Sequence, residues 1–256
     1  MKIHQEELAD VTRYIENFGT VNIADYQYQY DNYMRILSRF KETTPETRIL
    51  EIGTGTGWFP IMCKMRGLQC KGLEISPQLI QHAKELGHHY GVDPDIELGN
   101  IEESEVGDNA YDIVVAFSVF EHVEHWRRGL ERVYKALRPG GMLMFGSTNK
   151  FGPSGEYDFP LYGWLPDKWR YKLRIAKQGP DIMKLGIDFN QFRYPLLRKA
   201  FEEIGFREIY DRVQFADPEH TSSPSRGRVL SLCKKLPPVK HVVLTFIQDT
   251  NFVCIK

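Results

Sequence analysis

The sequence predicts an α/β fold built on a doubly wound, mostly parallel β-sheet, and two observations carry this prediction. Five short apolar segments alternate with helical patterns through the first 150 residues, which is typical of parallel strands joined by helices. The first apolar segment ends in the glycine-rich turn Gly53-Thr54-Gly55-Thr56-Gly57. Because glycine tolerates positive φ and lets a backbone approach a ligand closely, such turns bind nucleotides.

The strand segments follow one another in a regular order. We expect the first five strands at 48–53, 70–75, 96–98, 111–117 and 142–146. The fourth is an apolar run and is therefore predicted to be a central strand covered on both faces. Two later strands, near 208–215 and 251–255, bring the predicted number to seven.

Helix signals lie between these strands. Ser76 is positioned to cap a helix that has Pro77 at its first position, and Gly91 ends that helix. Apolar residues recur at helical spacing through 126–137, where a Pro-Gly-Gly segment follows. A further helix is expected to begin at Pro195 and to end at Gly205.

Three parts are distinguished along the chain. Residues 1–44 are expected to form an N-terminal helical cover, and residues 45–256 a single catalytic domain. Within that domain, residues from about 150 to 190 interrupt the alternation of strands and helices and are rich in Gly, Pro and aromatic residues. This composition predicts a lid inserted over the substrate site. Basic and apolar residues alternate over 168–175, which favours a strand with one basic face.

Composition and charge limit the partners. The formal net charge is -1, so bulk electrostatics do not predict nucleic-acid binding. The four cysteines form no Cys-x-x-Cys pair and are expected to be reduced thiols. No signal peptide or membrane span is found, which predicts a cytoplasmic protein. The basic residues of 168–174 leave contact with an acidic membrane surface or an anionic substrate open, and the oligomeric state is not predicted.

Glu51 determines which nucleotide suits the glycine turn. It lies two residues before Gly53, where a carboxylate would repel the pyrophosphate of a dinucleotide. An ionised Glu51 would instead favour a ligand with positive charge. S-adenosylmethionine (AdoMet) fits this requirement, because it carries an ammonium and a sulfonium and has no phosphate.

Five motifs then occur in the order that class I AdoMet-dependent methyltransferases show. They are ILEIGTGTGWF, KGLEIS, LGNIEE, YDIVVAFSVFEHV and LRPGGMLMF, and the chain resembles this family over roughly residues 45–215. The resemblance implies a Rossmann-like, seven-stranded sheet with helices on both faces, and AdoMet as cofactor. Related methyltransferases that share the Trp-Leu-Pro segment at 164–166 favour a helix for the residues after it, so the strand and helix alternatives both stay open there.

The resemblance also implies a set of cofactor-binding residues. Glu74 would accept hydrogen bonds from the ribose hydroxyls, and Asn100 would bind the adenine amino group where family members usually carry Asp. Ile101 would pack on the adenine ring. The complete expected set is Glu51, Gly53, Thr54, Gly55, Gly57, Glu74, Ile75, Asn100, Ile101, Phe117 and Ser118.

His122 is the candidate catalytic residue. It follows the fourth strand, and an imidazole has a pKa suited to removing a hydroxyl proton; an orienting or packing role is the alternative. The segment Glu121-His122-Val123-Glu124-His125 also has metal-ligand types. Quinone-pathway O-methyltransferases that it resembles add an acid three residues before the Glu-His pair. Ser118 occupies that position here, so no metal is predicted.

Aromatic residues of the insertion are the candidate substrate contacts. Tyr157, Tyr162 and Trp164 are expected to line the acceptor site, with Phe159 and Trp169 nearby. A small satellite core is the alternative for these side chains.

The sequence therefore predicts an AdoMet-dependent methyltransferase of a small molecule, with a hydroxyl oxygen of an aromatic or apolar metabolite as the acceptor. C- or N-methylation and a non-catalytic AdoMet-binding module are alternatives. A nicotinamide-dependent oxidoreductase is disfavoured by Glu51 and by Gly-x-Gly-x-Gly in place of Gly-x-Gly-x-x-Gly.

Overall fold

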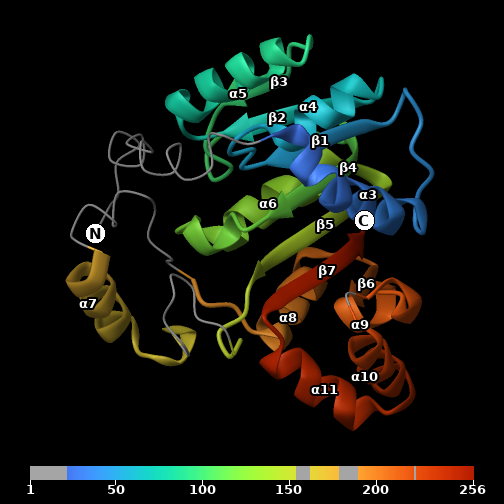
Figure 1. The fold of residues 1–256 in the computed structure, drawn as a ribbon, viewed down its shortest axis with the longest axis vertical. Helices are drawn as coiled ribbons and strands as arrows, with labels where there is room; N and C mark the ends of the chain where they lie inside the picture. Colours follow the sequence, from blue (N-terminus) through green and yellow to red (C-terminus); the bar gives the residue numbers. More distant parts are fainter. Residues whose placement is uncertain (1–21, 154–161, 179–189, 222) are drawn as a thin grey trace.

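The computed structural model describes residues 22–153, 162–178, 190–221 and 223–256. A seven-stranded sheet forms its centre, in the order β3-β2-β1-β4-β5-β7-β6 (Figure 1). The strands are β1 Arg48–Ile52, β2 Gln69–Glu74, β3 Asp95–Leu98, β4 Tyr111–Phe117, β5 Leu137–Thr148, β6 Glu208–Asp211 and β7 Asp249–Ile255. Strands β1 to β5 pair in parallel, and β7 is antiparallel to β5 and β6. The predicted fold class is confirmed.

Helices cover both faces of the sheet. The chain forms α3 Gln27–Ser38, α4 Trp58–Met65, α5 Pro77–His89, α6 Trp126–Ala136, α7 Asp167–Gln178, α8 Tyr194–Ile204, α9 Arg212–Phe215, α10 Pro224–Lys235 and α11 Pro237–Phe246, with 3-10 turns η1 Ile23–Tyr26, η2 Phe120–His122, η4 Tyr162–Trp164 and η6 Pro218–His220. On one face Leu50 packs with α6 and α8; on the other Ile49 packs with α3 and α4. Consecutive residues of a strand thus pack into the cores on opposite faces of the sheet, because side chains alternate between the two faces.

Local signals behaved as predicted at two helices. The Ser76 Oγ accepts a hydrogen bond from the Leu79 N–H (3.3 Å), and Pro77 is the first residue of α5. Helix α8 ends at Gly205, whose φ of 113° is the left-handed conformation of a helix cap. These ends depend on residues close in sequence, which is why they could be read from it.

The predicted bounds of two strands, β6 and β5, need correction. Strand β6 ends at Asp211, well before residue 215, because Asp211 and Gln214 form a capping box that starts α9. Strand β5 begins at Leu137, earlier than residue 142. Its Pro-Gly-Gly segment contains Gly140 at a positive φ of 73° and lies at a register shift against β4. The segment stays joined to the sheet because Lys256 pairs with Gly140 and Gly141 through the main chain (3.0 and 2.9 Å).

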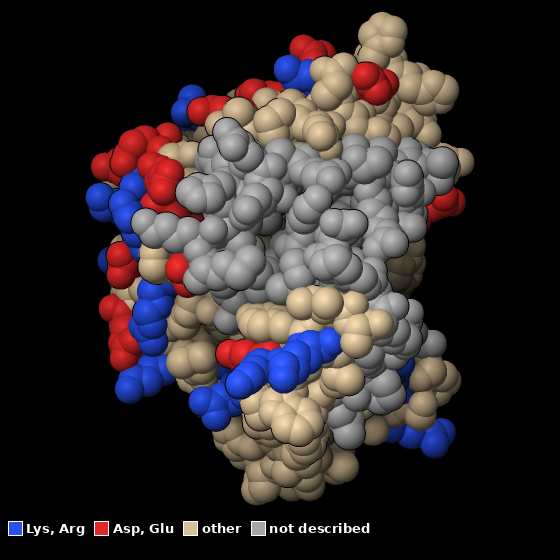
Figure 2. All heavy atoms as spheres, turned by 90° about the vertical axis from the view of Figure 1, so that its left-hand side faces the viewer, with Lys and Arg blue, Asp and Glu red and all other residues tan. Residues whose placement is uncertain are grey.

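Residues 167–178 form a helix, which decides between the two alternatives left open. On α7 the side chains of Lys168, Trp169 and Lys172 are exposed. Figure 2 views the molecule from the side on which α7 lies and shows Lys and Arg side chains in a row there. Contact of this face with an acidic membrane stays a prediction. Among the residues that the structure describes, no helix has the length and apolar character needed to span a membrane.

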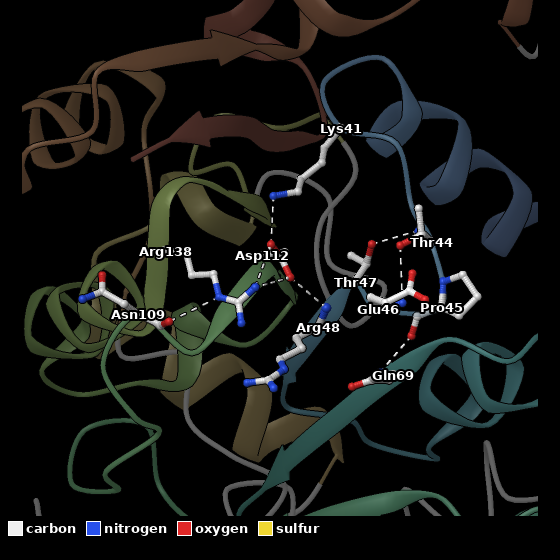
Figure 3. A network of polar contacts seen from close by, with 10 residues as sticks. All are labelled: Lys41, Thr44, Pro45, Glu46, Thr47, Arg48, Gln69, Asn109, Asp112 and Arg138. Carbon is white, nitrogen blue, oxygen red and sulfur yellow. Dashed lines mark hydrogen bonds and ion pairs between the residues drawn. The ribbon is translucent and has the colours of Figure 1, made fainter.

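A charged network joins the strands at the end opposite their carboxyl ends. The Asp112 carboxylate accepts hydrogen bonds from Lys41 Nζ (3.0 Å), the Arg48 main-chain N–H (3.0 Å) and Arg138 Nη1 (3.2 Å to Oδ2), as Figure 3 shows. Partial burial acts to raise the pKa of Asp112, but the bond from Arg48 and the charges of Lys41 and Arg138 together lower it. Asp112 therefore ties β1, β4 and β5 to the segment after α3.

Replacing Asp112 by asparagine should destabilise the protein by about 1–2 kcal/mol at neutral pH, because charge-assisted bonds are lost around a side chain that is 13% exposed. A lowered folded pKa means that this stability exists above the ordinary pKa and is lost as the pH falls through the folded value. Urea unfolding measures the difference, with the exposed Asp93→Asn as control. Equal stability of the two variants would contradict the prediction.

Candidate active site

The glycine turn after β1 has a backbone that only glycine accommodates well. Gly53 has a φ of 69°, and a Cβ there would lie 2.3 Å from Val119 Cγ2. Gly57 has a φ of 76°, and a Cβ there would lie 2.5 Å from Ala83 Cβ. The turn thus packs tightly on its neighbours and leads directly into α4.

Glu74, at the end of β2, holds this turn in place. Its Oε2 accepts a hydrogen bond from the Gly55 N–H (2.9 Å), and its Oε1 accepts from the N–H groups of Ile75 (2.9 Å) and Ser76 (3.1 Å). Burial raises the pKa of Glu74, and the three main-chain bonds oppose that rise. Sequence reasoning missed this structural role, and the expected role toward a ribose stays a prediction.

A large cavity of about 1960 Å³ opens at the carboxyl ends of β1, β4 and β5, where doubly wound sheets bind ligands. Seven of the predicted residues line it: Glu51, Gly53, Thr54, Gly55, Phe117, Ser118 and His122. Gly57, Glu74, Ile75, Asn100 and Ile101 do not line it. The Asn100 Oδ1 instead accepts the Glu102 N–H (2.9 Å), and Ile101 is buried in the core. Their expected adenine and ribose contacts remain predictions.

Glu51 is the most unusual group of this cavity. It is 7% exposed, and its Oε2 is buried without a hydrogen-bond partner in the described part of the chain. Burial, and to a smaller extent the nearby Cys63 and Glu74, raise the pKa of Glu51 well above its ordinary value. Burial therefore opposes ionisation of Glu51 in the ligand-free protein, and the pairing of an ionised Glu51 with a cationic ligand stays a prediction.

An aromatic wall from the N-terminal region closes one side of the cavity. Tyr26 stacks on Trp58 with ring centroids 4.9 Å apart, and Tyr33 stacks on Phe117 at 4.5 Å. The Tyr33 hydroxyl also accepts a hydrogen bond from Gln29 Nε2 (3.0 Å). The sequence predicted a helical cover for residues 1–44 but assigned none of its side chains to the site. Helix α3 thus covers the site as well as the sheet.

The turn that carries His122 is firmly anchored. The Asn190 Nδ2 donates to the carbonyls of Phe120 (3.2 Å) and Val123 (2.6 Å), and its main-chain N–H donates to the carbonyl of Glu121 (3.0 Å). The buried Glu121 carboxylate accepts from the Ser147 hydroxyl at 2.7 Å. His122 is therefore held at the cavity wall by bonds to the residues on both sides of it.

Ser118 enters this turn with a φ of 54°. Positive φ is uncommon for a residue with a side chain, and such strain gathers at functional sites. Its N–H donates to the Gly146 carbonyl (2.9 Å), which keeps the ends of β4 and β5 together. Within the described ranges, no group of three or more His, Cys, Asp or Glu side chains is arranged to hold a metal ion.

The predicted substrate contacts lie outside the cavity or outside the described residues. Trp164 is 43% exposed and packs on Phe151 (5.2 Å) and Phe246 (5.9 Å). It does not line the cavity, so it belongs to the satellite cluster that was the alternative. Tyr157 lies outside the described residues; for Tyr162 only the backbone, in η4, is described.

The C-terminal region supplies the remaining cavity wall, which sequence reasoning did not assign to the site. Helices α9, α10 and α11 gather beyond the β7–β6 edge (Figure 1). They and β7 contribute lining residues that include Arg212, Val213, Phe215, Arg226, Val229, Leu230, Val243 and Asp249. No motif marks them, because their place depends on how distant helices pack.

Comparisons with known proteins identify the central part of the chain. Residues 50–145, which run from β1 into β5, match the family model described as methyltransferase domain. Over 119 residues the chain is 30% identical to the malonyl-[acyl-carrier protein] O-methyltransferase of Serratia marcescens, covering 44% of each chain. Over 125 residues it is 30% identical to a ubiquinone biosynthesis O-methyltransferase of Methylobacterium sp., covering 46% of this chain and 49% of that protein. The chain thus spans about half the length of the curated relatives it matches.

Among solved structures, the fold is similar to that of Haemonchus contortus phosphoethanolamine N-methyltransferase 2 in complex with phosphomonomethylethanolamine and S-adenosylhomocysteine. The TM-score is 0.61 at 18% sequence identity, with all of this chain and 60% of that chain covered. This likeness concerns the fold.

Proposed function

We propose that this chain, whose residues 50–145 match the methyltransferase domain model, is a class I AdoMet-dependent methyltransferase that transfers the methyl group of AdoMet to a small-molecule acceptor. We propose a hydroxyl oxygen of an aromatic or apolar metabolite as the acceptor atom. The buried Glu51 carboxyl beside the glycine turn, whose Oε2 has no hydrogen-bond partner among the described residues, carries the proposal. A carboxyl there disfavours a pyrophosphate and favours a cationic ligand.

The residues of the cavity suit AdoMet. Glu51 would pair with its positive groups, and the buried Thr54 Oγ1, which also has no hydrogen-bond partner in the described ranges, would accept or donate one more bond. The glycine turn would allow close approach of the ligand to the main chain. Bound AdoMet supplies an activated methyl on a sulfonium. The protein's task is to align this methyl with the acceptor and to exclude water.

The size of the cavity supports a two-ligand site. About 1960 Å³ exceeds the roughly 300–1,000 Å³ of a typical small-molecule pocket, so it has room for a cofactor and an acceptor together. Residues of the glycine turn would contact the cofactor. The apolar residues of α10 and α11 would contact the acceptor. His122, on the wall past β4, would take the proton from the acceptor hydroxyl.

Calorimetry with AdoMet, S-adenosylhomocysteine and NAD tests the cofactor assignment. We expect binding of the first two and none of NAD. Tight NAD binding without heat from the other two would overturn the assignment and the reaction class with it. A screen of hydroxyl, amine and carbon acceptors for S-adenosylhomocysteine release then tests the acceptor atom, and release only with an amine would contradict the oxygen assignment.

Glu74→Ala should weaken AdoMet binding by about tenfold or more, because hydrogen bonds to a carboxylate are charge-assisted. The ligand-free protein should also unfold at a lower temperature, since three main-chain N–H groups lose their acceptor. Calorimetry and thermal unfolding measure both effects, with Glu97→Ala, an exposed acid on β3, as control. Unchanged affinity together with a lowered midpoint would leave Glu74 a purely structural role.

A further inference from the structure

Arg35, on α3, is a half-buried cation whose guanidinium is incompletely hydrogen-bonded among the described residues. Its Nη2 donates to Asn32 Oδ1 at 2.6 Å. Its Nη1 is buried, lacks a hydrogen-bond partner in the part of the chain that the structure describes, and belongs to a residue that lines the cavity. A guanidinium presents a planar fork of donors that suits a carboxylate. Leaving one donor buried and unmet is costly.

The acids of the cavity wall near the C-terminal helices have partners of their own. Asp249 lies 3.7 Å from Arg212 Nη1. Asp217 caps η6 by accepting the Glu219 N–H (3.0 Å) and pairs with His220 (3.1 Å). Each of these acids already has a hydrogen-bonding or charged partner other than Arg35.

A second arginine lies one helical turn beyond Arg35 and reinforces the positive charge. Arg39 Nη1 donates to the Phe215 carbonyl, so its guanidinium is held where α3 meets α9. Both arginines line the cavity. This part of the wall also carries apolar side chains of Val213, Phe215, Val229, Leu230, Val243 and Ile247. The wall therefore offers cationic donors next to an apolar surface.

We propose that Arg35 is an anion-binding residue of this cavity and holds a carboxylate or a similar planar anion. The inference rests on the proposed function, because it takes the cavity as the methyl-transfer site. Two ligands present this chemistry: the methionine carboxylate of the cofactor, and an acidic group on an otherwise apolar acceptor. Arg35 pairs with either through the same fork, and Arg39 adds long-range attraction.

Two matched probe pairs separate these sources. S-adenosylhomocysteine and its decarboxylated analogue, S-adenosyl-3-thiopropylamine, differ by the carboxylate alone. The fluorescent 8-anilinonaphthalene-1-sulfonate and N-phenyl-1-naphthylamine share an aryl body and differ by the sulfonate. Binding of all four is measured to the wild type, to Arg35→Gln, and to Arg127→Gln, which changes an arginine on the surface.

Arg35→Gln should weaken the anionic member of one pair about tenfold and leave its neutral partner unchanged. If Arg35→Gln loses affinity only for S-adenosylhomocysteine, the anion that Arg35 binds is the cofactor carboxylate. If it loses affinity only for the sulfonate probe, the anion is an acidic group of the acceptor. Equal effects of Arg35→Gln on both members of each pair, or no effect on either pair, would overturn the proposal. If wild type fails to bind S-adenosylhomocysteine, the proposed function fails, while the sulfonate pair still decides the anion site.

Arg35→Lys keeps the charge and covers the case in which the glutamine variant does not fold. It removes the planar fork, so it should weaken the anionic probe while the neutral probe binds as before. Added salt should weaken the anionic probe in the wild type, and salt-independent binding would count against the proposal.

Discussion

Replacing Glu51 by glutamine is expected to weaken AdoMet binding about a hundredfold, because the ligand's positive groups lose a buried countercharge. Glutamine keeps the shape and removes the ionisable group at a position that is 7% exposed. The same change should stabilise the ligand-free protein at neutral pH, since it removes an acid whose ionisation is disfavoured by burial. Calorimetry measures the first effect and urea unfolding the second.

The pH dependence gives this prediction a sign. Burial, Cys63 and Glu74 raise the pKa of Glu51 well above 4.5. Below 4.5 the carboxyl is protonated in both the folded and the unfolded chain. As the pH rises, the unfolded chain releases this proton first, so the stability of the ligand-free wild type falls until the raised pKa is passed. The stability advantage of Glu51→Gln should therefore widen as the pH rises above 4.5, and the AdoMet affinity of the wild type should rise over the same window.

Glu131→Gln, an exposed acid on α6, provides the matched control. It removes the same charge from the protein without touching the cavity, so its affinity and its pH profile should follow the wild type. An affinity of Glu51→Gln equal to that of this control would show that another group receives the cation. A pH-independent difference in stability would show that Glu51 titrates as an ordinary acid.

His122→Ala should lower the turnover number by about a hundredfold or more when the acceptor is a hydroxyl, because a general base contributes roughly that factor. The loss should shrink at higher pH, where the hydroxyl ionises without help. AdoMet affinity should change little, since the glycine turn and Glu51 remain. Steady-state kinetics across pH, with S-adenosylhomocysteine release as the readout, measures these effects.

His125→Ala is the control for this variant, since His125 lies three residues away and is exposed. It should keep the turnover of the wild type. A loss for His122→Ala that stays the same at every pH would assign His122 an orienting role, because a positioning defect is not rescued by ionisation of the acceptor.

Much of the fold could be predicted because its signals are local. The β4 limits, Tyr111–Phe117, follow from a run that is apolar apart from Asp112, and the α5 start follows from Ser76 and Pro77. The glycine turn, with Glu51 before it, placed the site at the end of β1. Each signal lies within a few residues of the structure that it specifies, so neighbours in the chain suffice to read it.

The composition of the site depended on tertiary structure. Arg35 lines the cavity together with residues of helices far along the chain, and Arg39, one turn later, bonds to the Phe215 carbonyl of α9. Trp164 packs on Phe246 of α11 and does not line the cavity, and this contact with a helix far along the chain could not be foreseen from sequence.

The sequence alone therefore determined where the strands lie along the chain, the glycine turn, and the position of Glu51 before that turn. Only the tertiary structure decided which distant side chains share the cavity and which protonation state burial favours for Glu51. Helical and strand periodicities are properties of short segments. Desolvation and long-range packing arise when segments remote in sequence exclude water together, so no local pattern records them.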